Sequence, residues 1–206
     1  MQRNDLTFRE ETPADFRAVE ELTREAFWDV YRPGCDEHFV LRNLRKSPGF
    51  VPELSLIAEQ DGELVGHIAY SIATLEADDG SEEKLVLFGP VSVKPGLQKK
   101  GIGSALILHS LEAAREMGFR GVFIYGNPAY YGRFGFGDAA RFSVTTADGK
   151  NFPEFMGLEL TPGSLSGLSG RLREDNAFYV IPPDELAAYD ATFPPREKRF
   201  VGTPIN

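Results

Sequence analysis

The chain has 206 residues, 42% of them hydrophobic, and a formal net charge of −9 at pH 7. This length predicts one domain with a substantial core and argues against a second full domain. The acidic balance argues against nucleic acid or an anionic membrane as the main partner. It slightly favours cationic substrates, although solubility alone explains the acidity equally well.

The single cysteine and the lack of a recognisable targeting signal predict a cytoplasmic protein. Cys35 is the only cysteine, so no internal disulfide can form and nothing indicates an oxidising compartment. The first twenty residues carry several charges and no apolar run, and no window approaches the ~18 apolar residues of a membrane span. His38, His67 and His109 lie far apart in the sequence, so no metal site is expected.

The first part of the chain predicts a strand and two helices. Residues 6–9 alternate as in a strand. Thr12 and the proline after it predict the start of a helix over 13–27. The range 36–45 predicts a second, shorter helix with Asp36 as its N-cap.

A hairpin and an irregular strand follow. Asp61-Gly62 lies between two strand-like runs, 54–60 and 63–75, and this pair favours a tight hairpin turn. The next strand, 84–93, is interrupted by Gly89-Pro90. Because proline cannot donate to a strand ladder and glycine permits a bulge, we expect the pairing to loosen there.

The second part of the chain predicts a crossover and a C-terminal extension. A helix at 102–117 and a strand at 121–125 follow the strand at 84–93, so these two strands should be parallel. The remaining expected elements are a short helix at 129–133, strands at 137–146, 156–160 and 177–181, a loop at 163–170 and a helix over 183–191. We divide the chain into a core, 1–146, and an extension, 147–206, packed on the same domain.

The middle of the chain has an unusual charge pattern. Residues 84–111 include Lys84, Lys94, Lys99 and Lys100 and no Asp or Glu, although the whole chain has 31 acids. An even spread would place roughly four acids in this range. The pattern therefore predicts a bound anion.

The glycine-rich turn 98–103 lies inside this range. Gly101 and Gly103 lack a Cβ, so the backbone can turn tightly and approach a ligand closely. The helix that follows begins with unpaired N–H groups and the positive end of its dipole. Such a turn can hold a diphosphate through main-chain donors.

The residues around the turn discriminate between phosphate-binding loops. The spacing of the nucleoside triphosphate loop is absent. The dinucleotide fingerprint needs a third glycine where Leu106 stands and an acid near Phe123, which makes a dinucleotide-binding oxidoreductase a weaker alternative. The pattern Gln-x-x-Gly-x-Gly after an apolar strand instead resembles the acetyl-CoA signature of the GNAT superfamily of N-acetyltransferases.

The resemblance extends over residues 6–146. It is carried by 54–59, 62–66, 89–93 and the run Tyr130-Tyr131-Gly132-Arg133-Phe134-Gly135-Phe136, and 155–163 is similar to a bacterial YhbS-type subgroup. It implies an α/β (α+β) GNAT fold: a mixed, mostly antiparallel sheet, splayed between the strands at 84–93 and 121–125, flanked by helices and followed by a C-terminal strand and helix extension.

The resemblance also implies acetyl-CoA as cofactor. Main-chain groups of the strand at 91–93 would bind the pantetheine arm, the turn would bind the diphosphate, and Asn127 would hydrogen-bond the arm. The residues implied for cofactor binding are Val91, Ser92, Val93, Gln98, Lys99, Lys100, Gly101, Ile102, Gly103, Ser104 and Asn127.

For catalysis, the resemblance implies Tyr131 as the group that protonates the CoA thiolate, with Tyr130 as the alternative. Many members of the family carry a glutamate on the strand that corresponds to 84–93, but residues 85–93 have no ionisable side chain here. The base therefore stays open between Glu37, His38 and Glu76, a water relay and a substrate that arrives neutral.

The resemblance places residues 28–38 beside the acceptor pocket. The implied substrate contacts are Trp28, Tyr31, Asp36, Glu37 and His38. We expect transfer of an acetyl group to a primary amine, on a small molecule or peptide, by direct attack in a ternary complex. The alternative is a CoA-binding sensor or interaction module with little catalysis, and a homodimer stays open.

Overall fold

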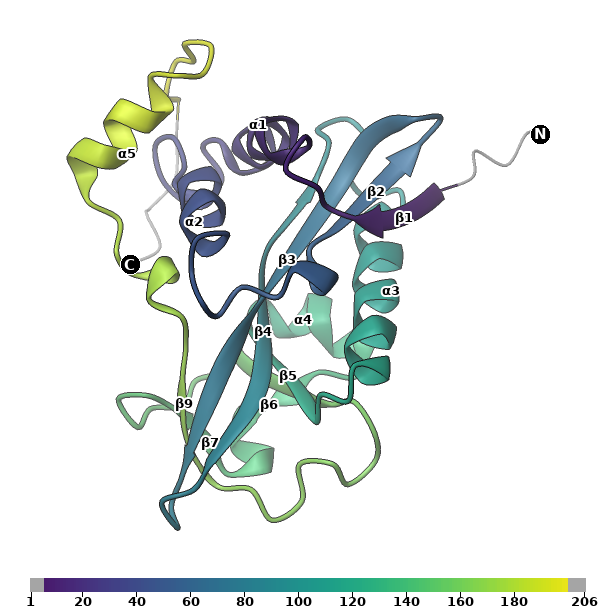
Figure 1. Cartoon of the computed structure of the whole chain (residues 1–206), viewed down its shortest axis with the longest axis vertical. Helices are drawn as coiled ribbons and strands as arrows, with labels where there is room; N and C mark the ends of the chain where they lie inside the picture. Colours follow the sequence, from purple (N-terminus) through teal and green to yellow (C-terminus); the bar gives the residue numbers. More distant parts are fainter. Residues whose placement is uncertain (1–5, 200–206) are drawn as a thin grey trace.

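One mixed β-sheet forms the frame of the molecule in the computed structural model, which describes residues 6–199 (Figure 1). The strands are β1 (Leu6–Glu10), β2 (Leu56–Gln60), β3 (Glu63–Ala77), β4 (Glu82–Val93), β5 (Gly121–Tyr125), β6 (Gly137–Asp138), β7 (Val144–Thr146), β8 (Phe155–Glu159) and β9 (Gly170–Arg173). The α-helices are α1 (Phe16–Phe27), α2 (Glu37–Leu44), α3 (Ile102–Glu116), α4 (Pro128–Tyr131) and α5 (Pro183–Asp190), and the 3-10 helices are η1 (Pro52–Leu54), η2 (Gly132–Phe134), η3 (Ala139–Phe142) and η4 (Asn176–Phe178).

The strand order is β1-β2-β3-β4-β5-β8-β6, and β9 pairs with both β3 and β7. Neighbouring strands are antiparallel except for the β4–β5 and β7–β9 pairs. The long strand β3 has different partners along its length: its first part pairs with β2, and Thr74–Ala77 pairs with β9. The predicted mixed, mostly antiparallel sheet is confirmed.

The sheet splits between β4 and β5. These two strands pair only at Val86 with Val122 and at Leu87 with Phe123. On the other side of β4, the register with β3 shifts at Gly89-Pro90, where the peptide bond is cis. The predicted loosening of β4 and the splay beside β5 are therefore both confirmed, and a gap opens between the carboxyl ends of two parallel strands.

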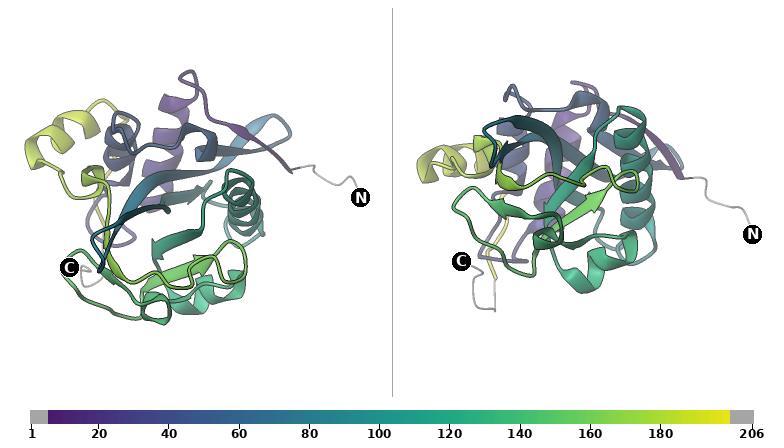
Figure 2. Two further views of the ribbon diagram at one scale, coloured as in Figure 1. Left: turned by 60° about the horizontal axis from the view of Figure 1, so that its bottom comes forward. Right: turned by 90° about the horizontal axis from the view of Figure 1, so that it is seen from below.

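Helices cover both faces of the sheet (Figures 1 and 2). On one face, Leu106, Ile107 and Leu111 of α3 pack against β-strand residues such as Ile68. On the opposite face, α1 and α2 form a smaller buried cluster with Ile57 and Ala69. Because side chains alternate along β3, Ile68 and Ala69 point to opposite layers.

The predicted start of the first helix is wrong by one turn. α1 begins at Phe16, and the segment before it is a turn. The Asp15 carboxylate accepts hydrogen bonds from the Thr12 N–H (2.8 Å) and the Thr12 hydroxyl (2.7 Å). Thr12 therefore donates its hydroxyl to an acid and does not cap the helix.

Two predicted strands near the end of the chain are also wrong. The range 137–146 contains two short strands separated by η3, where the Asp138 carboxylate accepts a hydrogen bond from the Ala140 N–H (2.8 Å). The range 177–181 begins in η4, and the additional strand is β9, immediately after the predicted loop. Leu172 of β9 is fully buried, but the exposed arginines on either side of it hide this pattern in the sequence.

The C-terminal part of the chain contributes to the same sheet as the N-terminal part. β8 lies between β5 and β6, and β9 pairs with the last part of β3. The division at residue 146 stays a prediction, and residues 1–5 and 200–206 lie outside the described range. Within residues 6–199, no helix combines the length and the apolar character needed to cross a bilayer.

Candidate active site

A cavity of about 810 Å³ extends from the N-terminus of α3 into the gap between β4 and β5. Its walls come from α1, the end of β4, the turn before α3, the end of β5 and α4. The lining residues are Ala26, Phe27, Val30, Tyr31, Val91, Val93, Gln98, Lys99, Gly101, Gly103, Ser104, Ile107, Tyr125, Gly126, Asn127, Tyr130, Tyr131 and Arg133. We call this space the donor cleft.

The turn before α3 forms one end of the donor cleft. Gly101 is the N-cap residue with φ of 92°, and it has no side chain to bond the first N–H groups of the helix. A Cβ on Gly103 would lie 3.3 Å from Val93 Cγ2 and 3.6 Å from Tyr130 Oη. The absence of these two side chains therefore leaves space for a ligand beside the positive end of the helix dipole.

Eight of the eleven predicted cofactor residues line the donor cleft, and three do not. Ser92 is fully buried, and its hydroxyl donates to Thr23 Oγ1 (3.0 Å). Ile102 is buried in the core beneath the helix, and Lys100 is exposed on the turn. Asn127 lies at the cleft, where its side-chain oxygen accepts a hydrogen bond from the Ala129 N–H (2.9 Å) and caps α4.

Tyr131 lies at the inner end of the donor cleft, held among aromatic rings. Its ring centroid lies 5.9 Å from Phe88 and 6.0 Å from Phe136, and a Cβ on Gly126 would overlap the Tyr131 ring. Burial, together with the neighbouring tyrosine hydroxyls, raises the pKa of Tyr131 to about 12. Its hydroxyl therefore stays protonated throughout the neutral pH range.

The neighbouring Tyr130 has a different setting. It is 36% exposed, and the Arg133 guanidinium lies 3.9 Å above its ring. The same guanidinium donates a hydrogen bond to Ser104 Oγ (3.2 Å). Tyr130 lines only the donor cleft, whereas Tyr131 also lines a second cavity.

The second cavity, of about 500 Å³, lies on the other side of Tyr131. It shares Phe27, Tyr31, Val91, Tyr125 and Tyr131 with the donor cleft, so the two spaces meet. Its other lining residues are Glu37, Val40, Leu87, Phe88, Gly89, Pro90, Ile124, Glu174, Phe178 and Tyr179. We call this space the acceptor cavity.

Glu37 is the predicted base candidate that lines the acceptor cavity. Its carboxylate accepts a hydrogen bond from the Asp36 N–H (3.1 Å). Burial, with a contribution from the negative charge of Asp36, raises the pKa of Glu37 to about 7. A carboxylate with this pKa can accept a proton near neutral pH and release it again.

The two other predicted bases lie elsewhere. His38 is fully buried between Tyr189 and Phe193, and burial lowers the pKa of His38 to about 4. Glu76 is at the far end of β3, paired with Arg173 (2.8 Å). Neither of them lines the donor cleft or the acceptor cavity.

Some of the predicted substrate contacts line a cavity, and others lie elsewhere. Tyr31 lines both cavities. The Trp28 indole donates to the main-chain oxygen of Glu197 (3.1 Å), under the C-terminal segment. Asp36 accepts a hydrogen bond from Arg32 (2.6 Å). A substrate role for Trp28, Asp36 or His38 stays a prediction, and the geometry does not favour it.

Tyr125, Glu174, Phe178 and Tyr179 are among the residues of the acceptor cavity that the sequence analysis missed. The Tyr125 and Tyr179 hydroxyls each donate to one oxygen of the Glu174 carboxylate, and burial raises the pKa of Glu174. Tyr125 could have been found, because it ends a parallel strand and ligands bind at such ends. The other three follow β9 in a segment without a motif.

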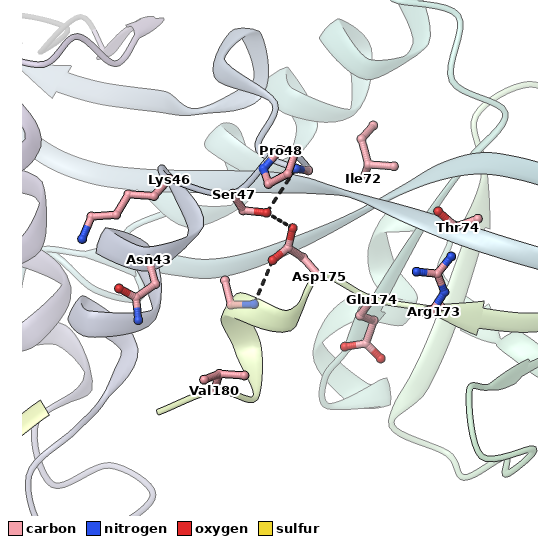
Figure 3. A pocket seen from close by; sticks show the side chains of 12 residues that line it. Asn43, Lys46, Ser47, Pro48, Ile72, Thr74, Arg173, Glu174, Asp175 and Val180 are labelled. Carbon is pink, nitrogen blue, oxygen red and sulfur yellow. Dashed lines mark hydrogen bonds between the residues drawn. The ribbon is translucent and has the colours of Figure 1, made fainter. Parts of the chain in front are cut away.

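A third cavity, of about 620 Å³, lies behind Glu174 (Figure 3). Asp175 closes one side, where it accepts hydrogen bonds from the Ser47 hydroxyl and from the Ala177 N–H (2.8 Å). The bond from Ser47 attaches the segment after β9 to the loop after α2. It therefore helps to place Glu174 at the acceptor cavity.

Comparisons with known proteins place this geometry in a family. Residues 7–139 match the family model described as an acetyltransferase (GNAT) domain. YjhQ of Escherichia coli K12, named as an uncharacterized N-acetyltransferase, is 32% identical over 136 residues, which are 66% of this chain and 72% of the relative. YhbS of Escherichia coli K12, named in the same way, is 27% identical over 166 residues, which are 80% of this chain and 93% of the relative.

Solved structures share the fold. The crystal structure of Escherichia coli YhbS in complex with CoA has a TM-score of 0.77 at 23% identity, with 88% of this chain and 96% of that chain covered. A GNAT family acetyltransferase from Brucella melitensis in complex with acetyl-CoA has a TM-score of 0.68 at 31% identity, with 85% and 99% covered. The resemblance seen in the sequence is confirmed, and the chain belongs to the GNAT family of acetyltransferases.

Proposed function

We propose that this protein is an acetyl-CoA-dependent N-acetyltransferase that acts on a primary amine by direct attack in a ternary complex. The observation that carries the proposal is that the donor cleft and the acceptor cavity meet at Tyr131. Structural neighbours with this fold were crystallised with CoA and with acetyl-CoA, which supports the same ligand for the donor cleft.

The residues of the donor cleft fit this ligand. The N-terminus of α3, with Gly101 and Gly103, would hold the diphosphate through main-chain N–H groups, and Lys99 adds positive charge at the same end. The edge of β4 that faces β5 is unpaired beyond Leu87 within the described residues. Its main-chain groups at Val91 and Val93 would hydrogen-bond an extended amide-bearing arm as a further strand does.

Bound acetyl-CoA would supply the acetyl group as a thioester, so that the amide N–C bond forms as the C–S bond breaks, one proton leaves nitrogen and one is taken up at sulfur. Tyr131 holds the second proton on its hydroxyl. A primary amine has a pKa near 10, so only about one molecule in a thousand is neutral at pH 7. Glu37 would accept the proton that the ammonium must lose before attack. The proton that the nitrogen loses after attack would return to the Tyr131 oxygen, whose own proton has passed to sulfur.

The only cysteine of the chain is poorly placed for a covalent intermediate. Cys35 is buried, 8% exposed, and outside both cavities. Burial raises the pKa of its thiol far above the ordinary value, so the nucleophilic thiolate is disfavoured. These features support direct attack, and isolation of an acetylated cysteine would contradict it.

The test is an amine-library screen with wild-type protein, acetyl-CoA and CoA release as the readout. We expect acetylation of at least one class of primary amine, with product identity verified by mass. Calorimetric binding of acetyl-CoA without turnover on any amine would support the alternative of a CoA-binding sensor. Absence of both binding and turnover would refute the proposed function.

A further inference from the structure

The lining residues of the acceptor cavity restrict the acceptor more than the volume of the cavity does. Most of its lining is apolar or aromatic, with Val40, Phe88, Ile124 and Phe178 among the wall residues. Its charged groups are two carboxylates, Glu37 and Glu174. Within the described part of the chain, no lysine, arginine or histidine lines it. The cavity therefore combines an apolar body with a negative potential.

Glu174 is built into the wall of this cavity. Two tyrosine hydroxyls, from Tyr125 on β5 and Tyr179 after η4, donate to its two oxygens. The next residue, Asp175, is fixed to the loop after α2 through Ser47 (Figure 3). Since each carboxylate oxygen can accept more than one hydrogen bond, Glu174 keeps acceptor capacity for a ligand.

Glu37 and Glu174 have different partners. Glu37 receives a main-chain hydrogen bond and lies on α2, whereas Glu174 receives hydroxyl groups and lies beyond β9. Glu37 is the proton acceptor in the proposed reaction, which leaves Glu174 without a role in the chemistry. A carboxylate that lies in an apolar wall and accepts hydrogen bonds from two hydroxyl groups is suited to recognise the charge of the substrate.

Resting on the proposed acetyl transfer, we propose that the acceptor is a primary amine on an aromatic or alkyl body without a carboxylate or phosphate, and that Glu174 excludes anionic acceptors. A cationic amine is attracted to the cavity by Glu174 and by the ionised form of Glu37. An acceptor that also carries an anion must place it against a like charge with no cation to pair with it, which costs binding energy. Free amino acids are therefore poor acceptors, and their decarboxylated counterparts are good ones.

Matched acceptors test the proposal on wild-type protein. We would compare tyramine, tyrosine and tyrosine methyl ester, and separately hexylamine and 6-aminohexanoate. The expected kcat/KM is at least about tenfold higher for the amine than for its carboxylated partner. The methyl ester keeps the bulk of the carboxyl group but not its charge, so it should recover most of the loss. Equal or better acetylation of tyrosine and 6-aminohexanoate would overturn the proposal.

A variant tests the role of Glu174 itself. Glu174→Gln should reduce the preference for tyramine over tyrosine by at least about threefold, because it removes one of the two like charges. Glu112→Gln, which makes the same charge change on the exposed face of α3, should leave that ratio unchanged. An unchanged ratio in folded Glu174→Gln would remove Glu174 from the role.

Binding gives a readout that does not depend on turnover. In the presence of CoA, calorimetry should show tyramine binding at least about tenfold more tightly than tyrosine. The outcomes separate the two proposals. Failure to bind acetyl-CoA and to acetylate any amine would refute the proposed function, whereas acetylation without discrimination against carboxylates would refute only the inference about the acceptor.

Discussion

Glu37 should cost the folded protein stability while serving the proposed reaction. Its pKa is raised from 4.5 to about 7 by burial, and a difference of one in pKa corresponds to about 1.36 kcal/mol. The upper limit is therefore about 3 kcal/mol, and partial exposure of the side chain reduces it to about 1–3 kcal/mol. Glu37→Gln should remove this cost, because glutamine keeps the hydrogen-bond acceptor and carries no charge.

The sign of the pH dependence follows from the direction of the shift. An acid whose pKa is raised on folding is protonated more readily in the folded state, so its contribution to stability is present below pH 4.5 and is lost as the pH rises to about 7. Wild type should therefore lose about 1–3 kcal/mol relative to Glu37→Gln between pH 4.5 and pH 7.5. Above pH 7.5 the difference between the two proteins should stay constant.

Urea unfolding of both proteins at pH 4.5, 6 and 7.5 measures this difference, and Glu112→Gln serves as the exposed control. Acetylation should fall by about 10²–10⁴ in Glu37→Gln, and the limb near pH 7 in the wild-type rate profile should disappear. A stability difference that does not change with pH would refute the argued burial of the charge. A rate profile that keeps its limb in Glu37→Gln would remove Glu37 from the role of base.

Three further variants probe the cleft and the core. Tyr131→Phe should lower kcat by about 10²–10⁴ with unchanged acetyl-CoA affinity, measured by steady-state kinetics and calorimetry, and an unchanged kcat would exclude Tyr131 as the acid. Gly103→Val should fill the donor cleft and abolish the stabilisation of about 2.7 kcal/mol that acetyl-CoA gives at a hundredfold over its Kd; a normal thermal shift would contradict this assignment. Arg45→Met should destabilise the fold by about 3–5 kcal/mol in urea unfolding, because Arg45 is 3% exposed and pairs with Glu11 at 1% exposure; a loss below about 1 kcal/mol would show that the pair is dispensable.

Local sequence signals predicted the cofactor side of the fold well. Asp61-Gly62 formed the expected hairpin turn, with positive φ at both residues. Gly89-Pro90 coincides with the shift in register of β4. In these places the backbone requirement is met by residues next to each other in the chain, so a short motif carries the information.

The acceptor side could not be predicted in this way. Glu174 and Tyr179 lie far from Glu37 in the sequence, and the pairing of β9 with β3 brings the segment that carries them to the cavity. Pairing between distant strands leaves little local signal. The strand β9 itself was missed because only Gly170 and Leu172 face inward, and such a short alternation is common in loops.

The donor cleft and the acceptor cavity also differ in how much of each the family match covers. The match to the GNAT domain covers residues 7–139, which include the donor-cleft residues from β4 to α4. Glu174, Phe178 and Tyr179 lie beyond that match, yet they complete the acceptor cavity. The donor cleft would bind its ligand through main-chain groups beside glycines. Ligand binding there therefore does not depend on which side chains stand at positions 174, 178 and 179. A relative can therefore keep the cofactor site while a different C-terminal segment presents another charge to the acceptor, and substrate choice in this protein should follow residues 174–179 rather than the turn before α3.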